Sequence, residues 1–317
     1  MQVFRKLDDL PSDLGPTLLS VGNFDGVHLA HQHVLCHMTE RARERRLVSM
    51  AVTFDPHPVR ILRPDLAPRL LTPLSAKLRL LEAEGLDAVL VIPFTRDLSL
   101  TPPQDFAEHV LGRQLRAMEV HEGANFHFGH RAEGNVERLA EFGRAFGFEV
   151  FIYPEMRLRG EPVSSSRIRE LLGEGRVSRA RHLLGRPFSV LAAVGRGRGF
   201  GQKFTVPTIN LGRYDEMTPA NGVYITRTRL AEDCYDSVTN VGVRPTFGGE
   251  SFAIESHLLD FHPVEVPGDA EVEISFLHWL RPEIKFPAVE ALRKQIARDA
   301  ARARRFFSCL KPASKMS

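Results

Sequence analysis

Short apolar runs alternate with helical patterns along the first 184 residues. The runs expected as strands are rich in Val, Ile and Phe, and they cover residues 17–24, 48–54, 87–94, 116–123 and 148–155. Residues 28–46, 75–85, 103–115 and 135–147 instead carry apolar side chains at spacings of three and four, which is typical of amphipathic helices. This succession predicts an α/β domain with a doubly wound parallel sheet, in which ligands bind at the carboxyl ends of the strands.

The pattern changes near residues 184–188, where Gly-Arg-Pro interrupts the last helical run. Short strands separated by Gly, Pro and Asn follow, and they predict an antiparallel β-barrel. Residues 287–307 then form one amphipathic pattern, which predicts a closing α-helix. We therefore expect two domains, 1–184 and 185–310, and a disordered tail at 311–317.

Composition agrees with two soluble domains. The 317 residues are about twice a typical domain of ~150. Lys plus Arg is 42 and Asp plus Glu is 39, and a net charge of only +3 argues against a dedicated polyanion binder. Cys36, Cys234 and Cys309 form no C-x-x-C pair, so a disulfide framework and a cysteine zinc site are not supported and a reducing cytoplasm is favoured. No signal peptide and no membrane span of roughly 18 apolar residues is expected.

His28 and His31 stand at the start of the helix expected after the first strand. They share a face of the first turn, where unpaired backbone N–H groups and the helix dipole attract phosphate. Two imidazoles there can donate to an α-phosphate as charge builds during displacement of pyrophosphate, which is nucleotidyl transfer. Ordinary surface histidines and a metal site are the alternatives. The position after a strand and the Asp25-Gly26 turn favours phosphate, and no nearby Cys supports zinc.

A second pattern suited to phosphate is the serine run ahead of a helical stretch. Ser164 and Ser165 bring hydroxyls to the free N–H groups of a helix start, and Arg167 and Arg169 can make bidentate phosphate contacts. A plain helix cap with solvated arginines is the alternative.

The barrel opens with a glycine-rich, cationic stretch, GRGRGFGQKFTVPTINL, at residues 195–211. Glycines let N–H groups converge on anionic oxygens, and Lys and Arg neutralise them; Gly199, Gly201 and Lys203 are the candidates. A Thr hydroxyl and an Asn carbonyl, at Thr208 and Asn210, can hold Mg²⁺ through oxygen. A solvated loop or an RNA contact is the alternative.

Four segments of the first domain resemble the bacterial bifunctional riboflavin kinase/FAD synthetases: GNFDGVHLAHQ, TFDPHP, GANFHFGHRAEG and SSSRIRELL. The resemblance runs from about residue 17 to 307. It implies a nucleotidyltransferase-like N-terminal domain in which His28 and His31 stabilise the transferring phosphoryl group. The further site residues that it implies are Asn23 at the phosphates, Asn125 at the flavin and metal side, and Ser164, Ser165, Arg167 and Arg169 in a second phosphate-binding loop.

The barrel is similar to the riboflavin kinase part of the same family. The P-T-x-N motif implies that Thr208 and Asn210 contact metal and phosphates, and residues 221–225, 240–249 and 253–261 also match. Glu255 is the base that the resemblance implies. Without the resemblance, a solvent-facing Glu on an ordinary strand would be preferred.

Two departures from the family pattern are visible. Ala30 stands between the two histidines where the family usually has Gly, so a methyl group lies where backbone and nucleotide approach each other. Thr205-Val206 replace the Gly-Phe that usually precedes Pro-Thr. The sequence does not tell whether Ala30 impairs adenylyl transfer.

The resemblance implies that ATP phosphorylates riboflavin to FMN and adenylylates FMN to FAD with release of pyrophosphate, with Mg²⁺ at both sites. The expected partners are these small molecules, with no nucleic acid and no membrane, and the expected state is a cytoplasmic monomer or weak homo-oligomer. Two alternatives stay open: a riboflavin kinase with an impaired adenylyltransferase domain, and a non-catalytic flavin- or RNA-binding regulator suggested by the RGRG stretch.

Overall fold

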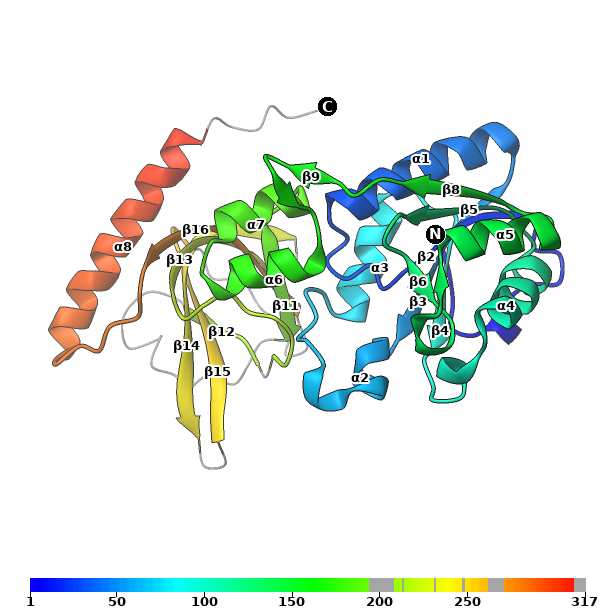
Figure 1. Cartoon of the computed structure of the whole chain (residues 1–317). Helices are drawn as coiled ribbons and strands as arrows, with labels where there is room; N and C mark the ends of the chain where they lie inside the picture. Colours follow the sequence, from blue (N-terminus) through cyan, green and yellow to red (C-terminus); the bar gives the residue numbers. More distant parts are fainter. Residues whose placement is uncertain (194–207, 213, 231, 247–248, 262–270, 311–317) are drawn as a thin grey trace. The chain divides into compact units, whose positions relative to one another are not determined.

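The computed structural model describes residues 1–193, 208–212, 214–230, 232–246, 249–261 and 271–310. The chain divides into two compact units, Met1–Ser165 and Ser166–Ser317 (Figure 1). Helices α6 (Ser165–Gly173) and α7 (Val177–Leu184) pack with the second unit; the Ser178 hydroxyl, for example, donates to the Leu277 carbonyl at 3.1 Å. The functional boundary expected at 184–185 stays a prediction.

The first unit is built on a six-stranded sheet of order β1-β4-β3-β2-β5-β8. Every neighbouring pair in it is parallel, which confirms the predicted doubly wound sheet. The five predicted strands form, and a three-residue edge strand that the sequence did not suggest joins them. The strands are β1 (Gln2–Phe4), β2 (Thr17–Val21), β3 (Val48–Asp55), β4 (Ala88–Pro93), β5 (Ala117–Gly123) and β8 (Glu149–Tyr153).

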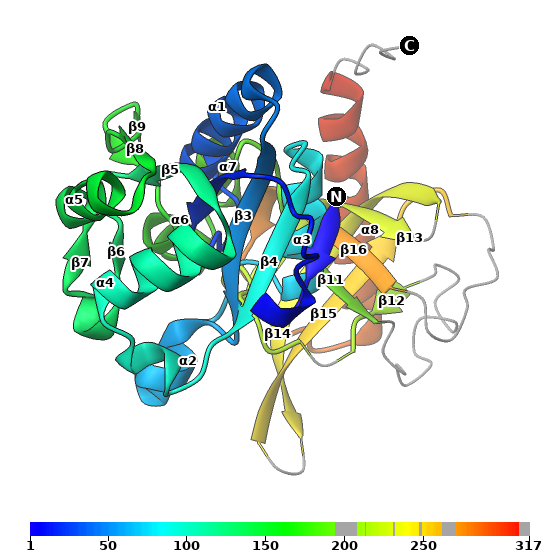
Figure 2. The ribbon, with the colours of Figure 1, turned by 90° about the vertical axis from the view of Figure 1, so that its right-hand side faces the viewer.

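Helices cover both faces of this sheet (Figure 2). Successive strand side chains point to opposite faces, so Leu18 packs against α1 and α3, whereas Leu19 packs against the helices of the other face. The helices of this unit are α1 (Leu29–Arg45), α2 (Pro58–Leu62), α3 (Leu74–Ala83), α4 (Pro103–Asp105) continued by a π-helix (Phe106–Gln114), and α5 (Val136–Phe146). Two small ribbons complete it, β6 (His127–Phe128) with β7 (Gly134–Asn135), and β9 (Arg157–Leu158) with β10 (Glu161–Pro162).

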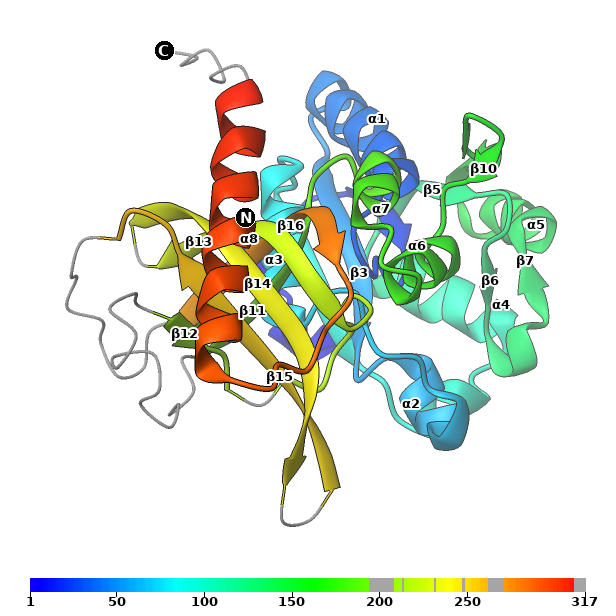
Figure 3. The same ribbon diagram turned by 90° about the vertical axis from the view of Figure 1, so that its left-hand side faces the viewer.

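The second unit is a curled antiparallel sheet, a half-barrel, whose described strands follow the order β11-β16-β13-β14-β15-β12 (Figure 3). The Gly212 N–H donates to the Ala193 carbonyl at 2.9 Å and so links the ends of the two edge strands. This confirms the predicted antiparallel barrel class. The strands are β11 (Phe188–Ala193), β12 (Thr208–Asn210), β13 (Gly222–Leu230), β14 (Asp233–Thr246), β15 (Gly249–Leu258) and β16 (Glu271–Arg281).

The predicted closing helix is α8 (Val289–Cys309), which packs on β14. It buries Ala300 and Ala303 against the outward side of the curled sheet, in a cluster with Val223 and Leu280. Beside them the buried carboxylate of Asp299 accepts from the Arg281 guanidinium at 2.8 Å. The helix is therefore fixed both by apolar contact and by a buried ion pair.

Candidate active sites

The turn between β2 and α1 has an unusual backbone. Phe24 and Val27 adopt positive φ angles of 45° and 37°, and Gly26 between them has φ of 84°. Positive φ is rare for a β-branched residue such as Val and costs conformational energy. A turn held in such a conformation keeps the histidines that follow it at a fixed place at the edge of the sheet.

His28 and His31 lie against each other, as their spacing predicts. His28 is the residue just before α1, with an extended backbone, and His31 is in the first turn of that helix. Their rings stack at a centroid distance of 3.6 Å and an angle of 14°. Phe24 packs edge-on against the His31 ring at 5.2 Å. The two imidazoles thus form one unit at a helix N-terminus that follows a strand.

The His31 imidazole is electrically neutral at neutral pH. Burial lowers its pKa well below the ordinary value of 6.5, and the charges of His28 and then Lys77 lower it further. Its Nδ1 atom is buried and has no hydrogen-bond partner among the residues that the structure describes. A neutral imidazole has one N–H donor and one acceptor nitrogen. His31 can therefore donate a hydrogen bond while it carries no net charge.

Asp25 anchors this turn to the segment before α3, although its sequence suggested only a chain reversal. Its carboxylate is 2% exposed and accepts from the N–H groups of Leu71 at 3.0 Å and Thr72 at 3.2 Å. The Ser165 hydroxyl donates to the Asp25 carbonyl at 2.8 Å. Asp25 therefore joins three segments that are distant in the sequence: the histidine turn, the segment before α3 and the serine run.

Lys77 is a second residue of this region that the sequence did not single out. It belongs to α3, is 4% exposed, and donates to the Thr53 hydroxyl at 3.4 Å. Thr53 in turn donates to the Asn23 carbonyl at 3.4 Å. In the sequence, Lys77 looks like one charge on the solvated face of a helix, and only the fold reveals its burial.

Two other predicted residues follow strands that are neighbours in the sheet. Asn23 comes after β2 and Asn125 after β5, and both are exposed. Because β2 and β5 are parallel and adjacent, their carboxyl ends lie at the same edge. Ser165 is held at that edge by its bond to Asp25. The structure therefore gathers Asn23, His28, His31, Asn125 and Ser165 along one side of the sheet.

The predicted serine run does start a helix, as expected. Ser165 is the first residue of α6, and Ser164 precedes it. Arg167 and Arg169 fall in the second compact unit, where Arg167 pairs with Glu170 at 2.9 Å. Their contacts with phosphate stay a prediction.

A buried carboxyl that the sequence did not suggest lies at the same sheet edge. Glu122, near the end of β5, is 4% exposed and accepts from the Val21 N–H at 2.5 Å. Burial raises its pKa well above the ordinary value, although the Val21 hydrogen bond partly offsets this. Burial therefore favours the neutral, protonated form of the Glu122 carboxyl.

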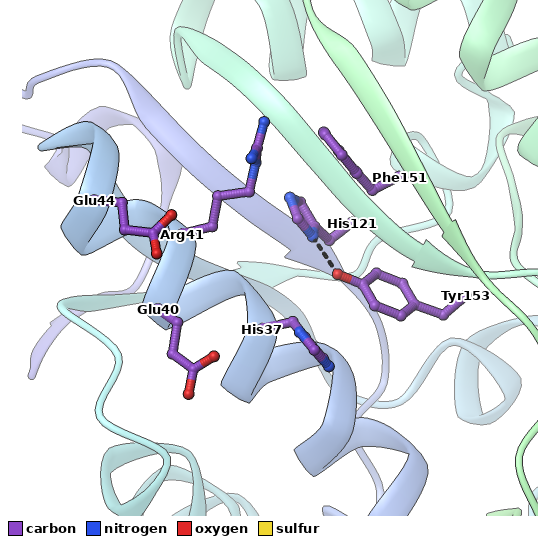
Figure 4. A pocket seen from close by; sticks show the side chains of 7 residues that line it. All are labelled: His37, Glu40, Arg41, Glu44, His121, Phe151 and Tyr153. Atoms are coloured by element: carbon purple, nitrogen blue, oxygen red, sulfur yellow. Dashed lines mark hydrogen bonds between the residues drawn. The ribbon is translucent and has the colours of Figure 1, made fainter.

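A hollow of about 290 Å³ opens farther along α1, between that helix and strands β5 and β8 (Figure 4). None of its lining residues was predicted as a site residue. They are His37, Glu40, Arg41, Glu44, His121, Phe151 and Tyr153.

A polar network lies under this hollow and ties α1 to the sheet. The Glu119 carboxylate is fully buried and accepts from Arg41 at 2.5 Å and from Arg45. His121 bridges Glu119, at 3.1 Å, and the Tyr153 hydroxyl, at 2.8 Å. Burial, followed by the charges of Arg41 and His37, lowers the pKa of His121 to about 4. Each ionic group is paired, so the network holds α1 in place.

In the second unit, strand pairing brings the predicted kinase residues together. Asn210 of β12 is directly opposite Glu255 of β15, and Thr208 is opposite His257. Side chains opposite each other in antiparallel strands have Cβ atoms about 4.5–5.5 Å apart, and residues two apart on a strand share a face. Thr208, Asn210 and Glu255 therefore lie on one face of the β12–β15 pair.

The same face carries residues that sequence reasoning missed. Asn240 of β14 is also opposite Glu255, and its amide donates to Glu283 at 3.3 Å. Burial, and then the charge of Arg304, lowers the pKa of His257. The sequence does contain a signal for His257: it stands two residues after Glu255 in IESH, and residues two apart on a strand share a face. Gly199, Gly201 and Lys203 lie outside the described residues.

Within the described part of the chain, no three His, Cys, Asp or Glu side chains are placed to hold a metal ion together. The oxygen donors on the β12–β15 face are the Thr208 hydroxyl, the Asn210 amide oxygen and the Glu255 carboxylate, and His257 lies on the same face. Oxygen ligands of this kind suit Mg²⁺.

Two family models match this chain: one match lies almost entirely in the first unit, and the other lies within the second unit. Residues 10–167 match FAD synthetase, and residues 184–307 match riboflavin kinase. A protein from Escherichia coli strain K12, named bifunctional riboflavin kinase/FMN adenylyltransferase, is 34% identical over 93% of this chain and 94% of its own length. The chain belongs to the bifunctional riboflavin kinase/FMN adenylyltransferase family. It therefore combines the two domains of flavin cofactor biosynthesis, as the sequence motifs predicted.

Other members of the bifunctional family match over similar lengths. The Haemophilus influenzae relative is 34% identical over 97% of this chain and all of its own length. The Pseudomonas fluorescens relative is 33% identical over 96% of this chain and 97% of its own length.

A solved structure extends the likeness to the whole fold. A crystal structure described as that of a macrolide-efflux protein from Streptococcus pneumoniae superposes with a TM-score of 0.84 at 26% identity, over 95% of this chain and 98% of that one. Among the described residues of this chain, no helix is long and apolar enough to cross a membrane.

Proposed function

We propose that this chain transfers phosphoryl from ATP to riboflavin in its second unit, and AMP from ATP to FMN in its first unit. The observation that carries the proposal is that two separate groups of phosphate-suited side chains lie each within the part of the chain that matches the corresponding family model. The comparisons give no support to the kinase-only alternative or to the non-catalytic regulator.

In the adenylyl transfer, a phosphate oxygen of FMN attacks the α-phosphorus of ATP. The new P–O bond forms as the bond to the β-phosphate oxygen breaks, and pyrophosphate leaves. His28 and His31 donate hydrogen bonds to the α-phosphate oxygens as negative charge builds on them. The stacked rings and the helix N-terminus support this role, because donors held in advance need no rearrangement during the reaction.

The remaining residues of the first site bind substrate. Asn23, Ser164, Ser165, Arg167 and Arg169 hold the ATP phosphates, and Asn125 lies at the flavin side. The hydrogen bond from Ser165 to the histidine turn supports a common phosphate site for the serine run and the turn. Arginine is suited to the outer phosphates because its guanidinium contacts two oxygens at once.

In the phosphoryl transfer, the primary hydroxyl of the ribityl chain attacks the γ-phosphorus of ATP, and ADP leaves. Glu255 accepts the hydroxyl proton as the new bond forms. Thr208 and Asn210 would hold Mg²⁺, which when bound neutralises charge on the ATP phosphates. The oxygen donors on the β12–β15 face fit this ion. Gly199, Gly201 and Lys203 complete the proposal as phosphate contacts.

The biological setting forms part of the same proposal. We infer a cytoplasmic enzyme, monomeric or weakly self-associating, whose partners are riboflavin, FMN and ATP and not nucleic acid. A near balance of 42 basic and 39 acidic residues supports the last point.

The test is to incubate the purified chain with riboflavin, ATP and Mg²⁺ and to separate the flavins. Both FMN and FAD are expected. A second incubation that starts from FMN isolates adenylyl transfer, and ATP labelled at the α- or γ-phosphate shows which group reaches the flavin. Formation of neither product would overturn the proposal. FMN without FAD would select the kinase-only alternative.

A further inference from the structure

Five hydroxyl side chains are fully buried inside the curled sheet of the second unit. They come from three neighbouring strands, β13, β14 and β15, and each is 0% exposed: Thr226, Thr228, Ser237, Thr239 and Ser256. Polar groups in a protein core are costly unless they are hydrogen-bonded. Five buried hydroxyls on one face therefore need hydrogen-bond partners inside the sheet.

The five hydroxyls close into a ring. The five contacts around it are Thr226–Ser237 at 2.8 Å, Ser237–Thr228 at 2.8 Å, Thr228–Ser256 at 2.7 Å, Ser256–Thr239 at 3.0 Å and Thr239–Thr226 at 2.7 Å. The proton of Thr239 goes to Ser256. The proton of Ser237 goes to the backbone carbonyl of Thr226 at 3.0 Å, so the donors do not all run in one sense around the ring. Each of the five hydroxyls contacts two others of the ring.

The ring also spans more than neighbouring strands. Thr228 is on β13 and Ser256 on β15, and β14 lies between these strands in the sheet. In a flat sheet, strands two apart are separated by about 9.6 Å, twice the ~4.8 Å spacing. Contact between these two hydroxyls therefore requires the sheet to curl inward at this point. The ring fixes that curl and the register of three strands together.

Register matters here because a slip by one residue moves a side chain to the other face of the sheet. Ser256 points into the ring, and its neighbour Glu255 lies on the opposite face of the sheet, the face that also carries its register partner Asn210 of β12. Apolar side chains would fill the interior but would tolerate small slips. A closed hydroxyl ring tolerates none, because any shift breaks bonds that have no water to replace them.

We propose that the hydroxyl ring positions the phosphoryl-transfer site, with Ser256 as the positioning residue that holds Glu255 against Asn210. The inference rests on the proposed roles of Glu255 and Asn210. It adds five residues that do not touch substrate and that act through strand β15.

The test uses the full chain and measures riboflavin phosphorylation and FMN adenylylation side by side. Ser256→Ala removes one ring member and leaves the Thr239 donor and the Thr228 hydroxyl unmatched. We expect its kcat for riboflavin phosphorylation to fall about tenfold and the Mg²⁺ concentration for half-maximal rate to rise, with adenylylation unchanged. Thr228→Val, which keeps the side-chain volume and removes a ring hydroxyl, is expected to act in the same direction. Ser256→Thr keeps the hydroxyl and is expected to restore kcat to within about twofold.

The matched control is Val241→Ala. Val241 is 0% exposed, lies opposite Ile254 in the same β14–β15 pair, and takes no part in the ring. The Val241→Ala substitution weakens packing and leaves the ring hydroxyls in place. Its kcat for riboflavin phosphorylation should therefore equal that of the parent at temperatures well below unfolding. Equal losses in kcat for Val241→Ala and Ser256→Ala, or an unchanged kcat in Ser256→Ala, would overturn the inference. Failure of the proposed function gives a different result from failure of this inference, because the unmodified chain would then form no FMN.

Discussion

Asn210 lies directly opposite Glu255 across the β12–β15 pair. One residue comes from a three-residue strand after the glycine-rich stretch, and the other from the middle of a long hairpin. Their sequence motifs suggest a metal ligand and a base separately, but only the strand register puts both on one face. The arrangement puts a carboxylate and an amide oxygen within one side-chain layer, which fits the proposed roles of Glu255 as proton acceptor and Asn210 as Mg²⁺ ligand.

The first prediction concerns Glu255. Glu255→Gln keeps the shape of the side chain and removes its ability to accept a proton. Because a general base contributes about 10²–10⁴-fold to rate, we expect riboflavin phosphorylation to fall at least about 100-fold. The measurement is the initial rate of FMN formation with saturating ATP and riboflavin.

Adenylylation of added FMN is the internal control, because its site lies in the other unit. We expect it to stay within about twofold of the parent rate. Riboflavin phosphorylation at the parent rate in the Glu255→Gln variant would remove Glu255 from the mechanism.

The second prediction concerns His31. His31→Ala removes one donor to the developing charge, and such donors are worth about 10²–10³ in rate, so adenylylation of FMN should fall by about that factor. The pKa of His31 lies well below 6.5, because of burial and the charges of His28 and Lys77, so it does not titrate between pH 6 and 8. The ratio of parent to variant rates should therefore be the same at both ends of that range. A ratio that changes with a midpoint near 6.5 would contradict a neutral donor.

Most of the fold follows from the sequence, because the elements that matter are long and strongly patterned. The parallel strands are short apolar runs between amphipathic helices, and each formed within a few residues of its expected bounds. The edge strand β1 was missed because it has only three residues, Gln2–Phe4, and pairs on one side only. A segment so short gives no periodicity to detect.

The site was predicted less completely than the fold. The histidine pair and the Thr-x-Asn motif have local patterns, so sequence reasoning found them. Asp25 and Lys77 act through contacts with distant segments, and in the sequence they look like a turn residue and a solvated charge. The hydroxyl ring of β13–β15 could not be predicted for the same reason. Ser and Thr at alternating strand positions are common in sequences, and only the curl of the sheet brings these five together.

The third prediction concerns Ala30, the departure from the family pattern. Ala30 is the second residue of α1 and is partly exposed, so its methyl group is not enclosed by the core. We expect the parent chain to form FAD, and Ala30→Gly to change the KM for ATP by less than about threefold. Gly is a poorer helix residue by about 1 kcal/mol, so a small loss of stability should accompany it. FAD formed by Ala30→Gly alone, with FMN only from the parent, would mean that the methyl group blocks the nucleotide.

The fourth prediction concerns Asp25. Its buried carboxylate accepts from the N–H groups of Leu71 and Thr72, and Asp25→Ala leaves these donors without an acceptor. Hydrogen bonds to a charged group contribute about 1.5–3 kcal/mol each, so we expect the free energy of unfolding of the first unit to fall by about 3 kcal/mol. Urea unfolding measures this loss. The KM for ATP in adenylylation should rise, because the histidine turn loses its anchor, whereas riboflavin phosphorylation should not change. Asp25→Asn retains one acceptor oxygen and should show a smaller loss.

The last prediction concerns the stability of the first unit in acid. The pKa of His121 in the folded chain is about 4, because burial disfavours the imidazolium and the charges of Arg41 and His37 repel it. The unfolded chain takes up the proton near the ordinary value of 6.5, so it binds more protons than the folded chain between pH 6.5 and 4. Stability is therefore full above pH 6.5 and falls as the pH drops toward 4, by an amount on the order of 3 kcal/mol.

The variant that isolates this contribution is His121→Gln, which has no proton to gain. Its stability at pH 7 should be lower than that of the parent, because the bridge between Glu119 and Tyr153 is altered, but its decline between pH 6.5 and 4 should be shallower. Tyr153→Phe is the matched control, since it removes the hydroxyl and keeps the titrating ring, and it should retain the steep decline. Urea midpoints at a series of pH values give all three curves. Parallel curves for the parent and His121→Gln would assign the acid sensitivity to other groups, because the imidazole would then take up its proton equally in the folded and unfolded chains.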